Sequence, residues 1–141
     1  MERILLDLVP MANKPICHAS QFDNGREIGI DLVEGANIFK FKEGDTAVLK
    51  ILKPDGTGLS SDIPVIEGND YVVITVTQDM SDLEGTNLCE LRIVNGNTDI
   101  GSSNFYMKME KSVDSNMPPQ KRGGLNTTSL EITSTTYTTG G

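Results

Sequence analysis

The amino-acid sequence predicts an all-β protein. Apolar residues make up 37% of the 141 residues, but aromatic residues make up only 5% and Trp is absent, so the core must be mostly aliphatic. Val, Ile, Thr and Gly are abundant, which favours strands and turns over helices. Several segments alternate apolar and polar residues, and turn sequences such as Asn95-Gly96 separate them. A chain of this length fits one domain plus a tail.

The first three expected strands precede residue 34. Residues 4–9 are rich in β-forming residues and end at Pro10, and residues 16–22 form a second extended segment before the turn Asp23-Asn24-Gly25. Residues 26–33 alternate most clearly, and one face carries Ile28, Ile30 and Leu32. This pattern predicts a strand with one buried and one solvated face.

The next two expected strands flank a tight turn. Residues 37–42 alternate with two aromatic residues on one face, Phe39 and Phe41. Residues 47–53 lead into Lys53-Pro54-Asp55-Gly56, where Pro occupies the second position and Gly the fourth. These are the preferences of a type I turn, so we expect a hairpin or a strand corner there.

Two further segments are predicted as strands, one from a weak pattern and one from a clear one. Residues 63–66 form a weak strand, and since Pro64 lacks a ladder donor we expect it at a sheet edge or a strand start. In residues 71–78 one face carries Val72, Ile74 and Val76, and the other carries Tyr71, Val73, Thr75 and Thr77, which predicts a central strand. Residues 78–84 do not alternate, and we expect Ser81 or Asp82 to cap a single helical turn that ends at Gly85.

The last two expected strands surround a hairpin signal. Residues 87–94 place three apolar side chains inward, Cys89, Leu91 and Ile93. Asn95-Gly96 follows, a dipeptide typical of type I′ turns because both central positions need positive φ. Residues 104–110 close the sheet, with one face formed by Phe105, Met107 and Met109.

A change of composition marks the expected domain boundary. Residues 1–113 carry the strands, and residues 114–125 resemble a linker because they contain Pro118-Pro119 and Gly123-Gly124. Residues 126–141 are dominated by Thr and Ser, with Leu130, Ile132 and Tyr137 as their few large apolar groups. We expect this tail to be disordered or to form a strand with a partner chain.

The charge balance narrows the class of partner. Twelve basic and twenty acidic residues give a net charge of −8, which disfavours nucleic acid and anionic membranes, so we expect protein partners. The longest apolar run near the start, Ile4-Leu5-Leu6, is interrupted by Asp7 and Pro10. It is too short for a signal peptide or a membrane-spanning helix.

The sequence offers few groups for catalysis. Cys17 and Cys89 are the only cysteines, and without a secretory signal we expect two reduced thiols rather than a disulfide. His18 is the only histidine and directly follows Cys17 in an expected strand, so the two side chains point to opposite faces. We therefore expect a half-buried strand histidine, no thiolate-imidazole dyad and no enzyme.

Two ligand motifs are incomplete, so we expect no cofactor and no metal. Asn95, Asn97 and Asp99 have the spacing of a calcium loop, but Ile100 and Tyr106 stand where the required Gly and Glu should be. The segment Gly56-Thr57-Gly58-Leu59-Ser60-Ser61 lacks the third Gly of a phosphate loop and a following helix. A hairpin and a turn are the simpler interpretations.

The chain also resembles a known family over roughly its first 113 residues. The likeness lies in the order and spacing of several segments: Leu6-Asp7-Leu8-Val9-Pro10, Ser20-Gln21, Asp23, Gly25-Arg26-Glu27-Ile28, Lys53-Pro54-Asp55-Gly56-Thr57, residues 80–85, Cys89-Glu90-Leu91-Arg92-Ile93 and Phe105-Tyr106-Met107. Together they resemble the N-terminal domain of upper baseplate and fibre proteins of tailed phages. We also expect Asp23 and Arg26 to pair across their turn.

The resemblance implies an immunoglobulin-like antiparallel β-sandwich that forms a homo-trimer. It implies an oligomeric adaptor of the virion, assembled in the host cytoplasm, that anchors a fibre or receptor-binding module to other virion proteins of the baseplate or capsid. The Thr/Ser/Gly-rich tail departs from the helical stem or receptor-binding region expected there. Either the chain is a short anchor whose tail pairs with another protein, or it is the anchoring end of a longer fibre.

One alternative stays open at this stage. A β-sandwich of this kind also suits a carbohydrate-binding module that contacts host surface glycans. Such sites usually stack an exposed aromatic ring on the sugar, and the chain has no Trp, so the residues to examine are Tyr71, Tyr106 and Tyr137.

Overall fold

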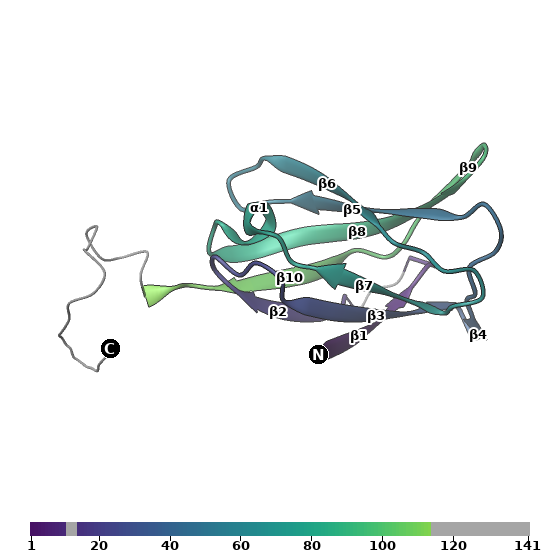
Figure 1. Ribbon diagram of the computed structural model, residues 1–141, viewed down its shortest axis with the longest axis horizontal. Helices are drawn as coiled ribbons and strands as arrows, with labels where there is room; N and C mark the ends of the chain where they lie inside the picture. Colours follow the sequence, from purple (N-terminus) through teal and green to yellow (C-terminus); the bar gives the residue numbers. More distant parts are fainter. Residues whose placement is uncertain (11–13, 114–141) are drawn as a thin grey trace.

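Two β-sheets pack face to face in the computed structural model, which describes residues 1–10 and 14–113 (Figure 1). This confirms the all-β sandwich expected from the sequence. The expected linker 114–125 and tail 126–141 lie outside the described residues, and the domain boundary at residue 113 stays a prediction.

The smaller sheet is built around one strand. The central strand β3 (Glu27–Glu34) pairs with β1 (Glu2–Asp7) along one edge. Its other edge pairs with β7 (Tyr71–Thr75) and, further along, with the two-residue strand β4 (Asn37–Ile38). The clean alternation of residues 26–33 is explained by this position, because Ile28, Ile30 and Leu32 face the core and are buried.

The larger sheet has the order β2-β10-β8-β5-β6. Its strands are β2 (Ile16–Ser20), β10 (Phe105–Glu110), β8 (Gly85–Asn95), β5 (Thr46–Leu52) and β6 (Gly58–Ile63), with β9 (Thr98–Gly101) pairing the far part of β8. Most pairs are antiparallel, as expected for a sandwich. The pairs β1–β3 and β10–β2 are parallel, since β1 and β2 reach the sheets through long connections rather than hairpins.

A single aliphatic core fills the space between the sheets. The buried cluster includes the inward-facing residues that the alternation predicted in β8 and β10, namely Cys89, Leu91, Ile93, Phe105, Met107 and Met109. Phe41 is the large aromatic residue from the β4–β5 connection, and its ring meets that of Phe39 edge to face at 5.1 Å between centroids. These two rings close the core beyond the short strand β4.

Hydrogen bonds also connect the two sheets at one side of the sandwich. Glu2 of β1 accepts a hydrogen bond from the backbone N–H of His18 in β2 at 2.7 Å. Its second carboxylate oxygen lies 2.9 Å from Nδ1 of His18. Because β1 and β2 belong to different sheets, this contact holds the two layers together at their edges.

The structure corrects the expected strand at residues 63–66. The edge strand is β6 (Gly58–Ile63), which follows the turn that Lys53-Pro54-Asp55-Gly56 predicts, with the N–H of Gly56 bonded to the carbonyl of Lys53 at 2.9 Å. Pro64 ends this strand rather than starting one. Polar residues occupy most of β6 because an edge strand buries little, so its alternation was too weak to recognise.

The expected central strand at residues 71–78 is also corrected. β7 pairs with β3, and no second partner strand is found in the described part of the chain. Its inward residues, Val72 and Ile74, are buried as the pattern required. Tyr71 and Val73 on its other face lie on the outer surface of the small sheet, and β7 is an edge strand rather than a central one.

The helical turn begins earlier than expected. α1 spans Gln78–Ser81, and its N-cap is Thr77, which makes no side-chain capping bond. Ser81 is the last helical residue, and its hydroxyl donates to the carbonyl of Asp23 at 2.6 Å. Contacts with other parts of the chain, rather than local capping, hold this turn.

The β8–β9 hairpin exists, but its turn type differs from the expected one. Asn95 pairs with Thr98, so the two central residues are Gly96 and Asn97 rather than Asn95 and Gly96. Gly96 stands first and has φ +59°, whereas Asn97 does not have a positive φ, and this combination is that of a type II′ turn.

Candidate interaction surfaces

Cys17 and His18 lie on opposite faces of β2, as their adjacency in a strand predicts. Cys17 is buried in the core, whereas the side chain of His18 is 63% exposed rather than half-buried. Burial raises the pKa of the Cys17 thiol to about 12, with a further contribution from the nearby Glu2 carboxylate. The thiol is therefore protonated at neutral pH and cannot reach the imidazole.

The second thiol is equally inert. Cys89 is a free cysteine on the inner face of β8, and burial raises the pKa of its thiol far above the ordinary value. A buried neutral thiol is a poor nucleophile, because the thiolate is the reactive form.

The residues of the incomplete ligand motifs have structural partners. The Asn95 amide donates to the Asp45 carboxylate at 2.9 Å and to the carbonyl of Glu43 at 3.0 Å, and Asp99 accepts from Arg92 at 2.8 Å. In residues 1–10 and 14–113 no three His, Cys, Asp or Glu side chains come together as a metal site would require.

The Gly56 segment likewise forms a turn. Asp55 accepts bonds from the hydroxyl of Thr57 at 2.6 Å and from its N–H at 3.0 Å. These two bonds lower the pKa of Asp55. No described helix is long and apolar enough to cross a membrane.

The tyrosines give little support to a sugar site. Tyr71 is partly exposed, but the Arg3 guanidinium lies over its ring, 5.3 Å from the centroid, where a sugar would stack. Tyr106 is half-buried on the outer face of the large sheet. Tyr137 lies outside the described residues.

An apolar row crosses the outer face of the large sheet. The strand registers place Ile16 beside Tyr106, Tyr106 beside Leu88, and Leu88 beside Leu52. Gly58 follows at the edge and carries no side chain. Because these residues come from five neighbouring strands, they form one continuous stripe on the surface, which is called the apolar row below.

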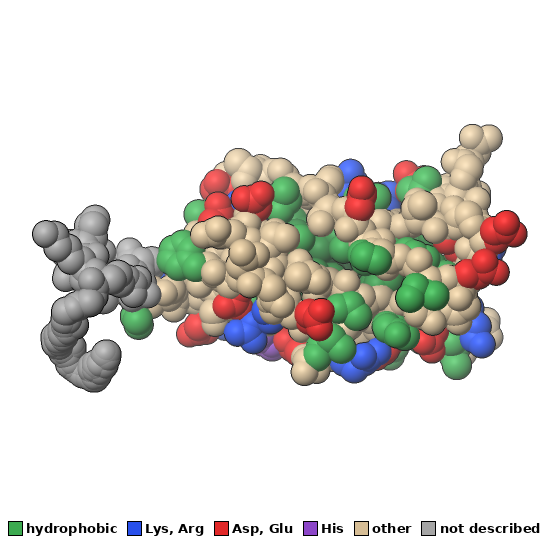
Figure 2. Space-filling model, viewed as in Figure 1, with side chains coloured by type: hydrophobic (Ala, Val, Ile, Leu, Met, Phe, Trp, Pro, Cys, Tyr) green, Lys and Arg blue, Asp and Glu red, His purple; other side chains and the backbone are tan. Residues whose placement is uncertain are grey.

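A shallow groove lies at one end of the apolar row. Its volume is about 390 Å³, and Leu52, Leu88 and Gly58 line it together with the polar side chains of Lys50, Glu90 and Asn104. Apolar side chains with a few polar groups at the rim are typical of a surface that receives part of a partner. Figure 2 shows that exposed apolar side chains also gather among polar ones on one broad face of the molecule.

The outer face of the small sheet carries a second exposed apolar area. Leu5 is 60% exposed beside Asp31, and Ile38 is 66% exposed beside Val33. On the same sheet, Arg3 and Asp31 form an ion pair with an N–O distance of 2.5 Å. Arg3 lies directly above Gly29, where a Cβ atom would come within 3.1 Å of its guanidinium. Glycine thus lets the arginine lie flat on the sheet.

The third exposed apolar area is the side chain of Phe22, at the end of the sandwich where the chain leaves β10. This chain-exit end consists of the loop 20–25, residues 76–85 and residues 111–113. Asp23 pairs with Arg26 there, as expected. Asp23 also accepts from the N–H of Ser20 at 2.9 Å, and although partial burial raises its pKa, this bond and Arg26 lower it overall. Phe22 directly precedes Asp23 and is exposed.

The sequence predicts the pairing of Asp23 with Arg26 but none of the three exposed apolar areas. The apolar row combines residues separated by up to ninety positions, and only the strand registers reveal it. Phe22 lies within residues 16–22, for which the sequence predicts an extended strand, but β2 ends at Ser20. The one available signal was its place next to the turn Asp23-Asn24-Gly25, which marked a loop but not its geometry.

Comparison with known proteins finds a likeness among solved structures. No family model matches the chain, and no curated protein matches it. Among solved structures, the "N-terminal domain of phage TP901-1 ORF48" matches with a TM-score of 0.60, covering 79% of this chain and 100% of that chain at 15% sequence identity. At this identity the likeness shows a shared fold.

Proposed function

We propose that this protein is a structural component of a phage virion. In this proposal it is a non-enzymatic β-sandwich that forms a homo-trimer and anchors a fibre or receptor-binding module to the baseplate or capsid. It is a part of the virion and is assembled in the host cytoplasm. Its partners are other virion proteins.

One observation carries the proposal. The sandwich matches the whole of a phage protein domain, and the match covers 79% of this chain. The sequence resemblance to baseplate and fibre proteins covers roughly the first 113 residues, which is nearly the same share of the chain. The fold and the order of the sequence segments point to the same kind of phage domain, which supports a phage structural role.

The surface chemistry suits such a role. The apolar row, the outer face of the small sheet and Phe22 are three exposed apolar areas on different sides of a small domain. A subunit that contacts neighbours in several directions needs several such areas, and copies around a symmetry axis can add weak contacts into firm attachment.

The enzyme alternative receives no support from the chemistry of the described residues. The two thiols are buried, the histidine is bonded to Glu2, and the candidate ligand groups are engaged in turns and ion pairs. The carbohydrate alternative relies on the tyrosine rings, and Arg3 covers the ring of Tyr71.

The oligomeric state and particle association test the proposal. Size-exclusion chromatography with light scattering of the full chain should give the mass of three 15.3 kDa subunits, about 46 kDa. An antibody against the protein should label purified particles. A monomer at every concentration together with unlabelled particles would contradict the proposal.

A further inference from the structure

Phe22 has a backbone conformation that its side chain does not favour. Its φ is +72°, and among the described residues it is the one residue other than glycine with a positive φ. A bulky side chain in this left-handed region clashes with its own backbone, which makes such a residue a genuine outlier. Residues held in this way often belong to functional sites.

The surrounding loop holds this conformation firmly. The N–H of Phe22 donates to the carbonyl of Ser81 at 2.8 Å. The flanking Asp23 bonds Ser20 in both directions, through its N–H at 3.0 Å and its carboxylate at 2.9 Å. The hydroxyl of Ser81 closes the arrangement by donating to the carbonyl of Asp23. The strain therefore persists because several bonds on both sides of Phe22 determine the backbone.

The fold of a single copy gains little from the Phe22 ring. The residue is 44% exposed, and it is outside both the buried core and the apolar side chains that pack against it. Asn or Gly would fit the left-handed position with less strain. In the isolated domain, both the strained backbone and the exposed aromatic ring are therefore unfavourable. This points to a contact between Phe22 and another molecule.

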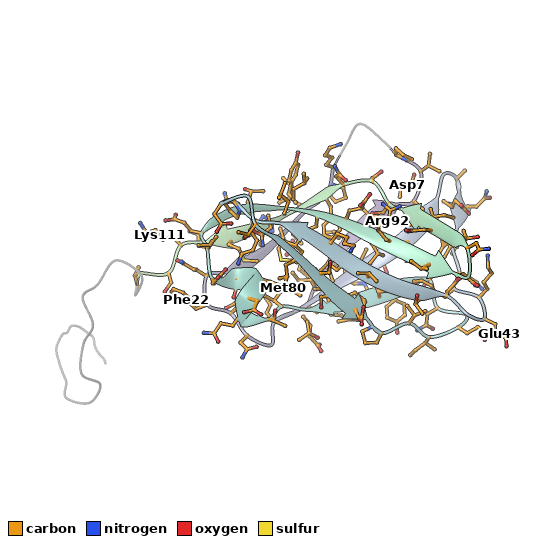
Figure 3. All side chains as sticks on the ribbon, turned by 90° about the horizontal axis from the view of Figure 1, so that it is seen from above. Asp7, Phe22, Glu43, Met80, Arg92 and Lys111 are labelled. Carbon is orange, nitrogen blue, oxygen red and sulfur yellow. The ribbon has the colours of Figure 1, made fainter. Side chains whose placement is uncertain are left out.

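The position of Phe22 identifies the direction of that contact. The adjacent Gln21 bonds the end of β10, with its N–H 2.7 Å from the carbonyl of Glu110, and its side-chain oxygen accepts from the N–H of Ser112 at 3.1 Å. Val113 follows and is 78% exposed. Figure 3 shows Phe22 and Lys111 at the same end of the molecule, opposite Glu43. Two exposed apolar residues thus lie where the chain continues into residue 114.

The charges at this end permit the approach of a second copy. The whole chain carries a net charge of −8, which opposes self-association. At the chain-exit end, however, Asp82 is paired with Lys53 at 2.6 Å and Glu84 with Lys111 at 3.5 Å. Asp23 is paired with Arg26. Three of the acidic side chains around Phe22 are therefore locally compensated.

We propose that Phe22 is the central residue of a contact between copies of this chain at the chain-exit end. This inference rests on the proposed homo-trimer. If the three copies of the trimer anchor one shared module beyond residue 113, their residues 113 approach the symmetry axis. Phe22, which lies at the same end, is then brought against the equivalent surface of the neighbouring copy. Burial of the ring in that contact offsets the strain of the loop. Large aromatic residues are common centres of such contacts.

The substitution Phe22→Asn separates this role from a structural one. Asn tolerates positive φ and removes the ring, so the melting temperature of the monomer should stay the same or rise. It is measured below the concentration at which the wild type associates. The dissociation constant of the oligomer, from sedimentation equilibrium of the full chain, should increase at least about tenfold. Ile66→Asn is the matched control, because Ile66 is exposed in the connection between β6 and β7 and belongs to none of the three exposed apolar areas, and it should leave that constant unchanged.

Each other outcome overturns the inference in a recognisable way. If Phe22→Asn keeps the trimer at wild-type strength, the inference is wrong while the proposed function stands. If Phe22→Asn and Phe22→Gly both lower the melting temperature of the monomer, the ring serves the fold of a single copy and not a contact. If the wild type never associates, both the inference and the proposed trimer are wrong.

Discussion

Asp7 shows how one carboxylate can join two elements of the fold. It lies at the end of β1, and its Oδ1 accepts hydrogen bonds from the N–H of Val9 at 2.8 Å and of Gly35 at 3.0 Å. The first bond shapes the exit from β1, and the second reaches the β3–β4 turn. The two bonds favour the charged form and lower the pKa of Asp7 below its ordinary value of 3.8.

A lowered pKa in the folded state makes stability depend on pH in a defined direction. The contribution of Asp7 is present above the pKa of the unfolded chain, near 3.8, and is lost as the pH falls through the lower pKa of the folded state. Asp7→Asn should therefore have a lower melting temperature than the wild type at pH 7, and the gap should close below pH 4.

Melting curves between pH 2 and 7 measure this gap. Asp62→Asn, in the edge strand β6, is the control for removing one negative charge from the surface. A gap for Asp7→Asn that is constant with pH would mean that the carboxylate charge contributes nothing beyond the two hydrogen bonds.

At the scale of elements, α1 depends on a buried side chain from another strand. Asn87 of β8 is fully buried, and its amide donates to the carbonyl of Met80 at 2.9 Å. No capping side chain holds the helical turn from within. The bond to Asn87 therefore fixes the turn against the large sheet.

Replacement of Asn87 should loosen this end of the sandwich. Asn87→Leu keeps the side chain near its size but leaves the Met80 carbonyl buried without its donor, which costs about 1–3 kcal/mol of unfolding free energy. Oδ1 of Asn87 has no hydrogen-bond partner among the described residues, so removing that atom offsets part of the cost. Urea unfolding measures the difference. If Asn87→Leu has the same unfolding free energy as the wild type, the hydrogen bond is not needed and packing alone holds α1 against the sheet.

The elements that the sequence predicted well are those with one buried and one solvated face. β3, β8 and β10 combine clear alternation with a fixed inner side, so both strand and core residues followed from a period of two. β6 was missed because an edge strand needs little apolar character. α1 was placed too late because its N-cap, Thr77, makes no side-chain capping bond and so gives no local signal of where the helix starts.

The candidate surfaces were harder to predict than the strands. The opposite orientation of Cys17 and His18 followed directly from strand geometry. The pairing of Asp23 with Arg26 followed from their opposite charges on either side of a short turn. The apolar row depends on the register between strands that are distant in sequence, which no local pattern contains. The left-handed backbone of Phe22 depends on Ser81, some sixty residues away.

At the scale of the whole molecule, the two thiols report whether the sandwich opens as one unit. Cys17 lies in β2 at the edge of the large sheet, and Cys89 lies in β8 in its interior, yet both face the same core. The raised pKa of each thiol leaves almost no thiolate at pH 8. Iodoacetamide should therefore modify neither residue rapidly in the native protein.

The rates of modification distinguish two ways of opening. If the sandwich unfolds cooperatively, both cysteines react at the same rate, and that rate rises with urea in parallel with global unfolding. Mass spectrometry of peptides from a time course gives the two rates separately, and protein in 8 M urea gives their unprotected values. A faster rate at Cys17 alone would mean that β2 detaches from β10 before the core opens. The Glu2–His18 contact between β1 and β2 opposes that detachment, so Glu2→Gln should selectively accelerate Cys17 if local opening occurs.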